Sequence, residues 1–453
     1  MHARVVLIVG SVAGIMGFGV PAWAQPSAEG ALTLARAVER ALETFPSVRA
    51  ARAGLDEAHA SVGEASAARL PSLQLNATAT RFEEPMLVSP IHSFTPAGIP
   101  SFDHTLYQGS LALNYTVFDG GARGARIRLA RAQAGSAESA LGAEGQALVA
   151  RVVSAYLEVL SQREVVAARD SHLVALGSEL TRAQQRHEAG TAARVEVLRV
   201  QAALATAEAE RVTTTEALNR AERELARLIN RSVEEVRIAG LVPVVLSDPL
   251  LPSRDALTTE AREANPTAKQ ARALAASAGE AVAVAKSARW PELGLVGTYL
   301  YYDSGNHGAD RTAEWNTGAK LSYVLFSGGA RERGITRAQA ALLSAEEQVR
   351  MAETQIDQEV DRAASRLDEA RARIKSLETA VARYEEVVRV EKLLRETGSG
   401  TETDYLNAEA DLLTARANLA EARYGEIAAR TDLARVVGQL DLAWLRRTIG
   451  DQP

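Results

Sequence analysis

The sequence predicts a mainly α-helical fold with a smaller β-barrel part, built from two copies of one strand–strand–long helix–helix unit. The duplication is visible because Phe118–Arg123 is answered 208 positions later by Phe326–Arg331, and Pro71 is answered 220 positions later by Pro291. Each copy holds two segments in which apolar and polar residues alternate, a pattern typical of half-buried strands. A long stretch rich in strong helix formers follows each Gly-Gly turn, and no residue interrupts it decisively.

The first 24 residues predict a secretory signal peptide. Arg4 precedes the apolar stretch Val5–Val20, and Ala22-Trp23-Ala24 forms a small-residue cleavage site. No later stretch reaches the roughly 18–20 apolar residues of a transmembrane helix. The chain contains no cysteine, which excludes disulfides and thiolate metal sites. Its formal net charge of -6 is a mixture of both signs, so we expect no nucleic-acid partner.

We expect a first repeat over residues 25–230, in which Pro46 separates two helices ahead of the strands. Its later elements are strands at about 72–81 and 106–118, a long helix at 121–188 and a helix at 192–230. At 1.5 Å per residue the long helix would measure roughly 100 Å. The shorter helices on either side of it sum to nearly this length. We therefore expect two short helices to stack end to end beside each long one.

The second repeat is expected over residues 253–440, with the same order of elements. Its strands are expected at about 292–302 and 314–326, its long helix at 329–397 and its last helix at 402–437. Residues 231–252 contain Val and Pro without periodicity and are interpreted as a connector packed at the waist. The tail 441–453 shows no informative pattern.

Aromatic residues gather on the strands, since 13 of the 21 lie within 71–118 and 290–326. This concentration favours the aromatic girdles of an outer-membrane barrel over the core of a soluble β-sandwich. A sandwich would also not require each strand pair to lead into so long a helix. The polar strand positions, such as Glu292 and Lys320, are expected to face water. The apolar positions expected to face lipid are Leu73, Leu75, Leu113, Tyr115, Leu293, Leu295, Tyr299, Trp315, Leu321 and Tyr323.

Four strands cannot close a barrel, and an open edge in hydrocarbon leaves backbone N–H and C=O groups unpaired at several kcal/mol each. The barrel must therefore be shared between copies of the chain. Two, three or four copies would give about 8, 12 or 16 strands, all of which are allowed.

The duplicated units and the motif Arg186-His187-Glu188-Ala189-Gly190, followed by Glu196-Val197-Leu198, resemble TolC-type outer-membrane efflux proteins. The resemblance covers essentially the whole mature chain. It implies a homotrimer with a 12-stranded barrel in outer-membrane lipid and a 12-helix α-barrel in the periplasm. It also implies a passive exit duct, not an enzyme, that works with a periplasmic adaptor and an inner-membrane pump. A type I protein secretion duct is the alternative within transport, and a periplasmic coiled-coil scaffold without a pore is the alternative outside it.

The resemblance implies two groups of site residues near the helical turns. The tips that would contact the adaptor are Gly190, Thr191, Gly398, Ser399, Gly400 and Thr401, and the periplasmic entrance would be lined by Asp404, Asn407, Glu196 and Arg199. The family can have a second acid where this chain has Asn407 and Arg199, which weakens the expected acidic ring. Arg186 and Arg395 lie near the turns and are expected to latch the closed entrance by pairing with Glu196 or Asp404.

No motif predicts a cofactor, a metal ion or a catalytic centre. Asp119–Gly124 lies between a strand and a helix, but no Gly-Lys-Ser/Thr follows it. The seven histidines are scattered without metal-ligand spacing. There is no Gly-x-Ser-x-Gly nucleophile turn either.

Overall fold

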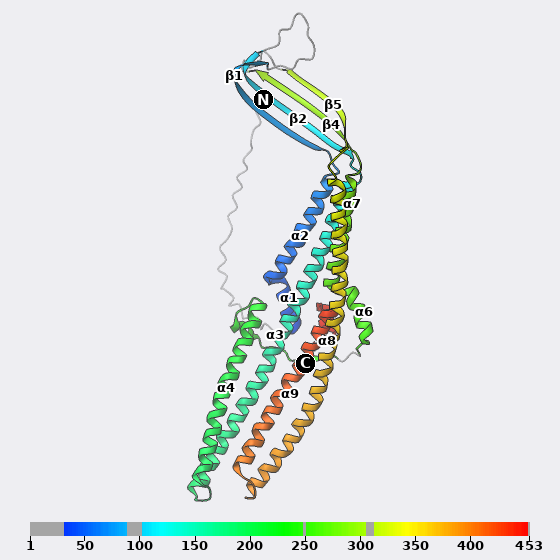
Figure 1. Ribbon diagram of the computed structural model, residues 1–453. Helices are drawn as coiled ribbons and strands as arrows, with labels where there is room; N and C mark the ends of the chain where they lie inside the picture. The colour runs from blue at the N-terminus through cyan, green and yellow to red at the C-terminus, as the bar shows by residue number, and fades with distance from the viewer. Residues whose placement is uncertain (1–30, 88–101, 248–250, 305–311, 452–453) are drawn as a thin grey trace, which may run out of the picture.

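The computed structural model describes residues 31–87, 102–247, 251–304 and 312–451. The signal peptide expected at 1–24 and most of the loop expected at 82–105 lie outside the described residues. The molecule is elongated, with a curved sheet at one end and a long helical bundle leading away from it (Figure 1). Among the described residues, no helix combines the length and the apolarity needed to cross a membrane.

The two repeats have the same order of elements. The first contains α1 (Leu34–Thr44), α2 (Pro46–Ala67), β1 (Ser72–Leu87), β2 (Phe102–Phe118), α3 (Ala122–Glu188) and α4 (Arg194–Leu228). The second contains α6 (Arg254–Ala264), α7 (Pro266–Ser287), β4 (Glu292–Ser304), β5 (Thr312–Ser322), α8 (Ala330–Glu396) and α9 (Glu402–Val437). The mainly helical fold of duplicated strand–strand–long helix–helix units is thus confirmed.

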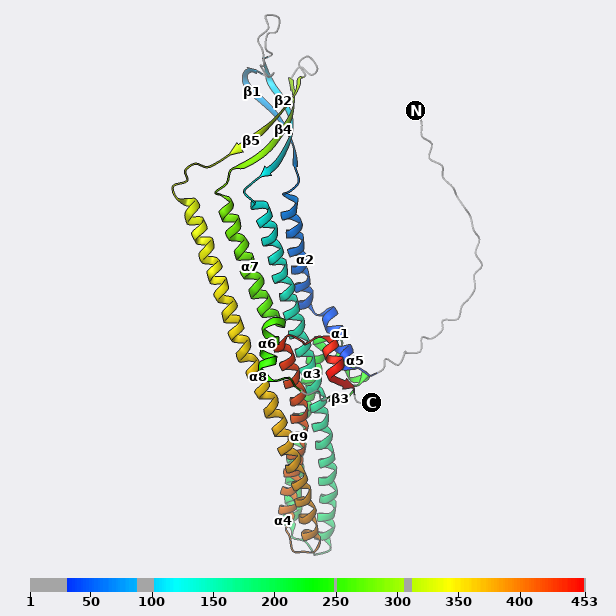
Figure 2. The ribbon, with the colours of Figure 1, turned by 90° about the vertical axis from the view of Figure 1, so that its right-hand side faces the viewer.

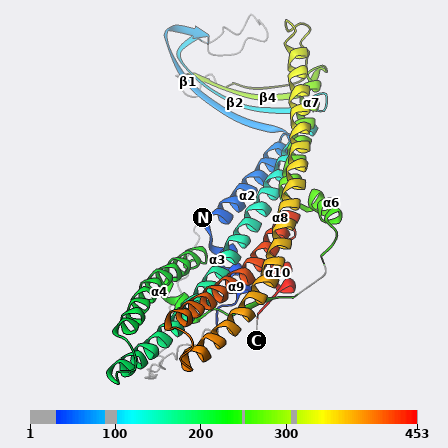
Figure 3. The ribbon, with the colours of Figure 1, turned by 60° about the horizontal axis from the view of Figure 1, so that its bottom comes forward.

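The long helices α3 and α8 have 67 residues each, or about 100 Å at the α-helical rise. Each begins after a left-handed glycine, Gly121 at φ 87° and Gly329 at φ 83°. Helices α7 and α9 both pack against α3 and α8, and they follow one another along the bundle (Figures 1 and 3). Short helices therefore do stack beside the long ones.

The largest differences from the sequence-based expectation concern three strand ends. The β1–β2 ladder continues past Arg81, after a register shift, to the pair Leu87 and Phe102. Both strands are therefore longer than the alternating pattern indicated. Strand β5 is shorter and ends at Ser322 instead of residue 326, because β4 begins at Glu292, opposite Ser322, and offers no partner beyond it.

The connector and the tail build a compact waist, and the sequence did not predict the helices and strands that they form there. The connector forms α5 (Val233–Ala239) and β3 (Val244–Leu246), and the tail forms α10 (Leu442–Thr448) and β6 (Ile449–Asp451). Strand β3 pairs with β6, and these elements lie with α1 against one side of the bundle (Figure 2). The fully buried Tyr156 of α3 fixes this belt, since its hydroxyl lies 2.7 Å from the carbonyl oxygens of both Leu32 and Val242.

Candidate functional site: the sheet faces and the helical tips

The four-stranded sheet has the order β1-β2-β4-β5, and every neighbouring pair is antiparallel. Residues opposite one another in such a ladder point to the same face, so the register shows which side chains share a face. Leu73 stands opposite Leu113, and Leu293 stands opposite Leu321. The residues expected to face lipid that share this face are Leu73, Leu75, Leu113, Tyr115, Leu293, Leu295, Tyr299, Trp315 and Leu321. Tyr323 lies just beyond the end of β5.

The opposite face is mainly polar. It carries Gln74, Asn76, Thr78, Ser110, Asn114, Thr298, Asn316 and Lys320, with Leu106, Ala112, Val296 and Leu300 as apolar exceptions. The apolar face is widely exposed, with Leu75 at 75% and Trp315 at 73%. A contiguous exposed apolar sheet face marks a membrane or protein contact. Within the described residues, the outer edges of β1 and β5 pair with no other strand.

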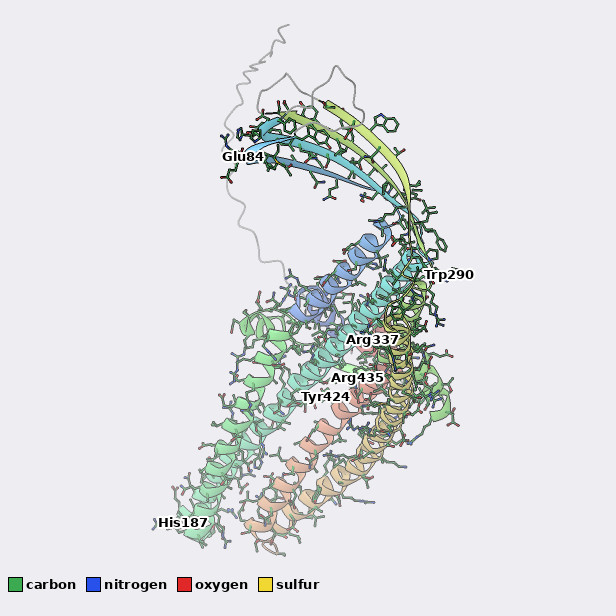
Figure 4. All side chains as sticks on the ribbon, turned by 45° about the horizontal axis from the view of Figure 1, so that its top comes forward. Glu84, His187, Trp290, Arg337, Tyr424 and Arg435 are labelled. Carbon is green, nitrogen blue, oxygen red and sulfur yellow. The ribbon has the colours of Figure 1, made fainter. Side chains whose placement is uncertain are left out.

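Two helical turns form the end of the bundle farthest from the sheet; Figure 4 labels His187 there and Trp290 at the junction of sheet and helices. Gly190 and Gly398 have φ of 73° and 76°, the left-handed conformation that commonly ends a helix. The Thr191 amide donates to the Arg186 carbonyl at 2.8 Å. In the second turn, a Cβ on Gly400 would lie 2.8 Å from the Cβ of Leu394. Backbone geometry therefore accounts for all three glycines of the tips.

The expected entrance residues lie around the first turns of α4 and α9. The carboxylate of the exposed Asp404 accepts a hydrogen bond from the Thr401 hydroxyl at 2.6 Å. The backbone amide of Asp404 donates to the Thr401 hydroxyl oxygen at 3.1 Å, so the two residues together cap α9. Asn407 is exposed one turn further along. Arg199 reaches from α4 to α9, where its Nη1 donates to the Thr403 hydroxyl at 2.9 Å.

The two arginines expected to form a latch meet in a buried group of charges. We call Glu179, Arg186, Arg395, Glu402 and Tyr405 the entrance cluster. The Nη1 of Arg395 lies 3.0 Å from an oxygen of Glu179 and 3.4 Å from one of Glu402. Arg186 lies 3.2 Å from Glu402. The side chains of Glu179, Glu402 and Arg395 are only 4%, 3% and 7% exposed, and the Arg395 guanidinium stacks over the Tyr405 ring at 4.0 Å.

The partners of Arg395 in the entrance cluster differ from those expected from the sequence. Arg186 does approach Glu196, at 3.9 Å, but Arg395 pairs with Glu179 and Glu402 and not with Asp404. The sequence contains a signal for these partners. Glu179 lies between the buried Leu176 and Ala183 on α3, and Glu402 precedes the buried Tyr405 by three residues on α9. A charge within an apolar helical stripe requires a partner of opposite charge.

Burial sets the protonation of this cluster. Burial first, and then the negative charge of Glu179, raise the pKa of Glu402 above its usual range, although Arg395 and Arg186 act against this. Burial disfavours the charge on Arg395, but the carboxylates of Glu179 and Glu402 outweigh it and raise the pKa of Arg395 above its ordinary value. Arg395 therefore stays charged, and Glu402 readily takes up a proton on acidification.

Acidification is expected to stabilise the cluster. Because the pKa of Glu402 is raised in the buried cluster, the buried form binds a proton more tightly than an exposed glutamate does. The stability contributed by this protonation is fully present below the ordinary carboxyl pKa and is lost as the pH rises through the raised pKa. If the cluster holds the entrance closed, conductance in planar bilayers should fall as the pH is lowered through the raised pKa of Glu402. Glu402→Gln should remove this part of the pH dependence, and an unchanged profile in that variant would contradict the assignment.

A second cross-link joins α9 to α3 nearer the waist, where the Tyr424 hydroxyl donates to Glu164 at 2.5 Å (Figure 4). It borders an open groove of about 990 Å³ between α3, α8 and α9. The lining combines alanines with charged residues such as Arg366, Glu369 and Arg373. No group of three or more potential metal ligands occurs among the described residues.

Comparison with known proteins identifies the architecture. The family model for outer membrane efflux proteins matches residues 37–231 and 257–439. The chain is 25% identical to the outer membrane protein TolC of Vibrio cholerae, over 91% of this chain and 92% of that protein. It is 26% identical to the alkaline protease secretion protein AprF of Pseudomonas aeruginosa, over 75% of this chain and 71% of that protein. The solved structure of the outer membrane protein VceC from Vibrio cholerae superposes with a TM-score of 0.73 at 21% identity, covering 89% of this chain and 96% of VceC.

Proposed function

Since the chain belongs to the outer membrane efflux protein family, we propose that it is the exit duct of a tripartite efflux system. In this system an inner-membrane pump and a periplasmic adaptor deliver substrates to it. Membership of the family places the protein in the outer membrane as an efflux or secretion channel, with its helical part in the periplasm. The family consists of channel proteins and not of enzymes, and the duct is proposed to work without a cofactor.

The observation that supports this proposal best is the division of the sheet into an exposed apolar face and a polar face, bounded by two open edges. The apolar face suits lipid, and the polar face suits a water-filled lumen. Open edges are too costly in hydrocarbon, so copies of the chain must close them. Three copies give 12 strands. They also give 12 helical columns, because each chain supplies α3, α8 and the two stacks α2 with α4 and α7 with α9.

A charge on the proposed lipid face should block membrane assembly. Leu113→Arg is expected to cost up to about 4 kcal/mol per copy at the depth of the bilayer midplane, and should sharply lower the amount of folded protein in outer-membrane fractions. Asn114→Arg is the matched control, because Asn114 neighbours Leu113 on β2 but lies on the polar face. Equal losses in the two variants would show that the assigned face does not contact lipid.

The tips are proposed to contact the adaptor. Exposed apolar side chains near them, Val195 at 50% and Leu393 at 55%, suit packing against helices of another protein. The residues proposed for this contact are Gly190, Thr191, Gly398, Ser399, Gly400 and Thr401. In the same proposal Asp404, Asn407, Glu196 and Arg199 line the entrance just inside the tips, and the entrance cluster holds it closed.

A type I protein secretion duct is the second candidate, favoured by the similarity to AprF. Cells that lack the protein should accumulate amphiphilic dyes if it serves efflux. Unchanged dye efflux together with the loss of one protein from the medium would support secretion instead. Mature protein that stays monomeric and dissolved without detergent would contradict both candidates and would favour a periplasmic scaffold.

A further inference from the structure

Basic side chains gather where the helical bundle meets the sheet. Helices α8, α7, α3 and α2 lie side by side below the strands (Figure 2). Their stretches nearest the sheet, 330–337, 280–289, 122–131 and 60–69, together contain ten basic and three acidic residues. The whole chain, by contrast, has a formal net charge of -6. A band of positive charge therefore borders the sheet of a chain that is acidic overall.

Acidic residues neutralise two arginines of this band, one in each repeat. The guanidinium of Arg123, at the start of α3, lies 3.1 Å from the carboxylate of Asp119. The guanidinium of Arg289, in the turn after α7, lies 2.7 Å from the carboxylate of Glu332. Because the sequence is duplicated, each pair has two counterpart positions in the other repeat. These positions show whether the neutralisation is repeated as well.

The counterpart of Arg123 is Arg331, 208 residues later, and its acid is missing. Ser327 stands at the position of Asp119. Its hydroxyl oxygen accepts a hydrogen bond from the Arg331 amide at 3.4 Å but carries no charge. The Arg331 guanidinium donates to the Val324 carbonyl. Arg331 therefore has a defined position at the start of α8 without an ion-pair partner among the described residues.

The counterpart of Arg289 is Arg69, 220 residues earlier, and its acid is missing too. Both arginines lie in the same kind of turn, since each amide donates to the carbonyl three residues before it, at 3.1 Å and 3.0 Å. However, Gly124 stands where the second repeat has Glu332. No carboxylate of the described part of the chain lies within ion-pair distance of the exposed Arg69. Each repeat thus lacks a different one of the two acids.

An exposed apolar side chain follows each arginine of this turn. Leu70, after Arg69, is 70% exposed, and Trp290, after Arg289, is 63% exposed. Figure 4 shows Trp290 at the junction of sheet and helices. A tryptophan at such a level is typical of the boundary between hydrocarbon and water in a membrane. Cations at the same level are positioned to meet the phosphates of lipid headgroups.

We propose that Arg69, Lys286 and Arg331, which we call the arginine collar, bind the headgroups of anionic phospholipids on the periplasmic side of the membrane. This inference rests on the proposed function, in which the apolar face of the sheet contacts lipid. Lys286 is exposed in the last turn of α7. Helices α2 and α8 are the outermost of the four (Figure 2), so Arg69 and Arg331 flank the same junction when copies of the chain close the sheet. Two cations without acidic partners at one junction favour a ligand that carries a phosphate.

The collar should make the purified oligomer select anionic lipid. Protein in detergent is incubated with equal amounts of phosphatidylglycerol and phosphatidylethanolamine that have the same acyl chains. The lipids that remain bound after gel filtration are then measured by mass spectrometry. A cation beside an anionic lipid surface raises affinity about fivefold, and salt weakens this attraction. We therefore expect the bound lipid to be enriched about fivefold or more in phosphatidylglycerol at low salt, and less at high salt. Equal binding of the two lipids would overturn the collar.

Restoring the missing acids tests the collar without removing any arginine. Gly124→Glu together with Ser327→Asp places carboxylates where the other repeat has them, and should remove most of the enrichment. A Cβ on Gly124 meets only the Arg128 guanidinium, at 3.5 Å, and Ser327 is exposed, so both new side chains have room. The matched control, Gly124→Gln with Ser327→Asn, has nearly the same shape without the charge and should keep the enrichment. Unchanged enrichment in the acidic variant, or equal losses in both variants, would contradict the proposal.

Two further measurements separate this proposal from its neighbours. The acidic variant should conduct in planar bilayers as the parent does, since the collar binds lipid and does not gate the duct. A conducting parent without phosphatidylglycerol enrichment would overturn the collar and leave the duct standing, whereas a parent that stays monomeric without detergent would overturn both. Release of the bound phosphatidylglycerol by millimolar glycerol phosphate would assign the collar to soluble anions and end the lipid assignment.

Discussion

Arg395→Leu is expected to open the periplasmic entrance and raise the conductance of the protein in planar bilayers. Arg395 is the cation shared by Glu179 and Glu402, and all three side chains are less than a tenth exposed. Its loss leaves Glu402 beside Glu179 with two more exposed cations: Arg186, which is 39% exposed, and Arg182, which is 53% exposed and lies 3.1 Å from Glu179. Removing one partner of a buried ion pair costs about 3–5 kcal/mol. That is sufficient to shift the balance of closed and open entrances by more than about a hundredfold.

The control is Arg389→Leu on the same helix, because Arg389 is 66% exposed and pairs with Glu386, one turn away. The conductance of the Arg389→Leu variant should match that of the parent protein, since exposed ion pairs contribute little to stability. Adding Glu402→Gln to Arg395→Leu should return conductance toward the parent value, because it removes the repulsion between the two carboxylates. Parent conductance in the Arg395→Leu single variant would show that the entrance cluster does not hold the entrance closed.

Gly438→Ala is expected to destabilise the joint where α9 meets the start of α7. Gly438 has φ 87°, and a Cβ there would lie 2.7–2.8 Å from backbone atoms of Ala264 and Asn265. The left-handed backbone costs about 1–2 kcal/mol for alanine, and the overlap adds roughly 1–3 kcal/mol because backbone cannot move aside as a side chain can. The joint also depends on Asn265, whose Nδ2 donates to the Val436 carbonyl at 2.7 Å. Tm of the protein in detergent measures the loss.

Gly121→Ala separates the two contributions to this loss. Gly121 has the same φ of 87°, but nothing lies within 4 Å of its Cβ position. Its variant should lose only the cost of the left-handed backbone and should keep a higher Tm than Gly438→Ala. Equal Tm values for the two variants would mean that the stacked helices shift at this joint and make room for the added methyl group.

The repeat and the periodicities determined most of the architecture. Alternation in Leu73–Asn76 specifies which strand residues share a face, because side chains of a strand point in turn to opposite sides. Gly190 and Gly398 specify the helical turns, because few other residues adopt their left-handed backbone without strain. These signals are local, so each can be recognised without knowing the rest of the fold. Because Phe118 and Phe326 lie 208 residues apart, each signal found in the first repeat could be located again in the second repeat.

Only the tertiary structure decided which distant groups meet. Glu179 and Glu402 lie more than two hundred residues apart, and their common partner Arg395 follows from how α3, α8 and α9 pack. The tail strand β6 joins β3 of the connector, although neither segment is periodic. The sequence of a three-residue strand contributes little stability to its pairing, so the core around Tyr156 must hold these strands in place. Ion-pair partners and short edge strands depend on packing across the whole chain, whereas faces and turns are properties of a few consecutive residues.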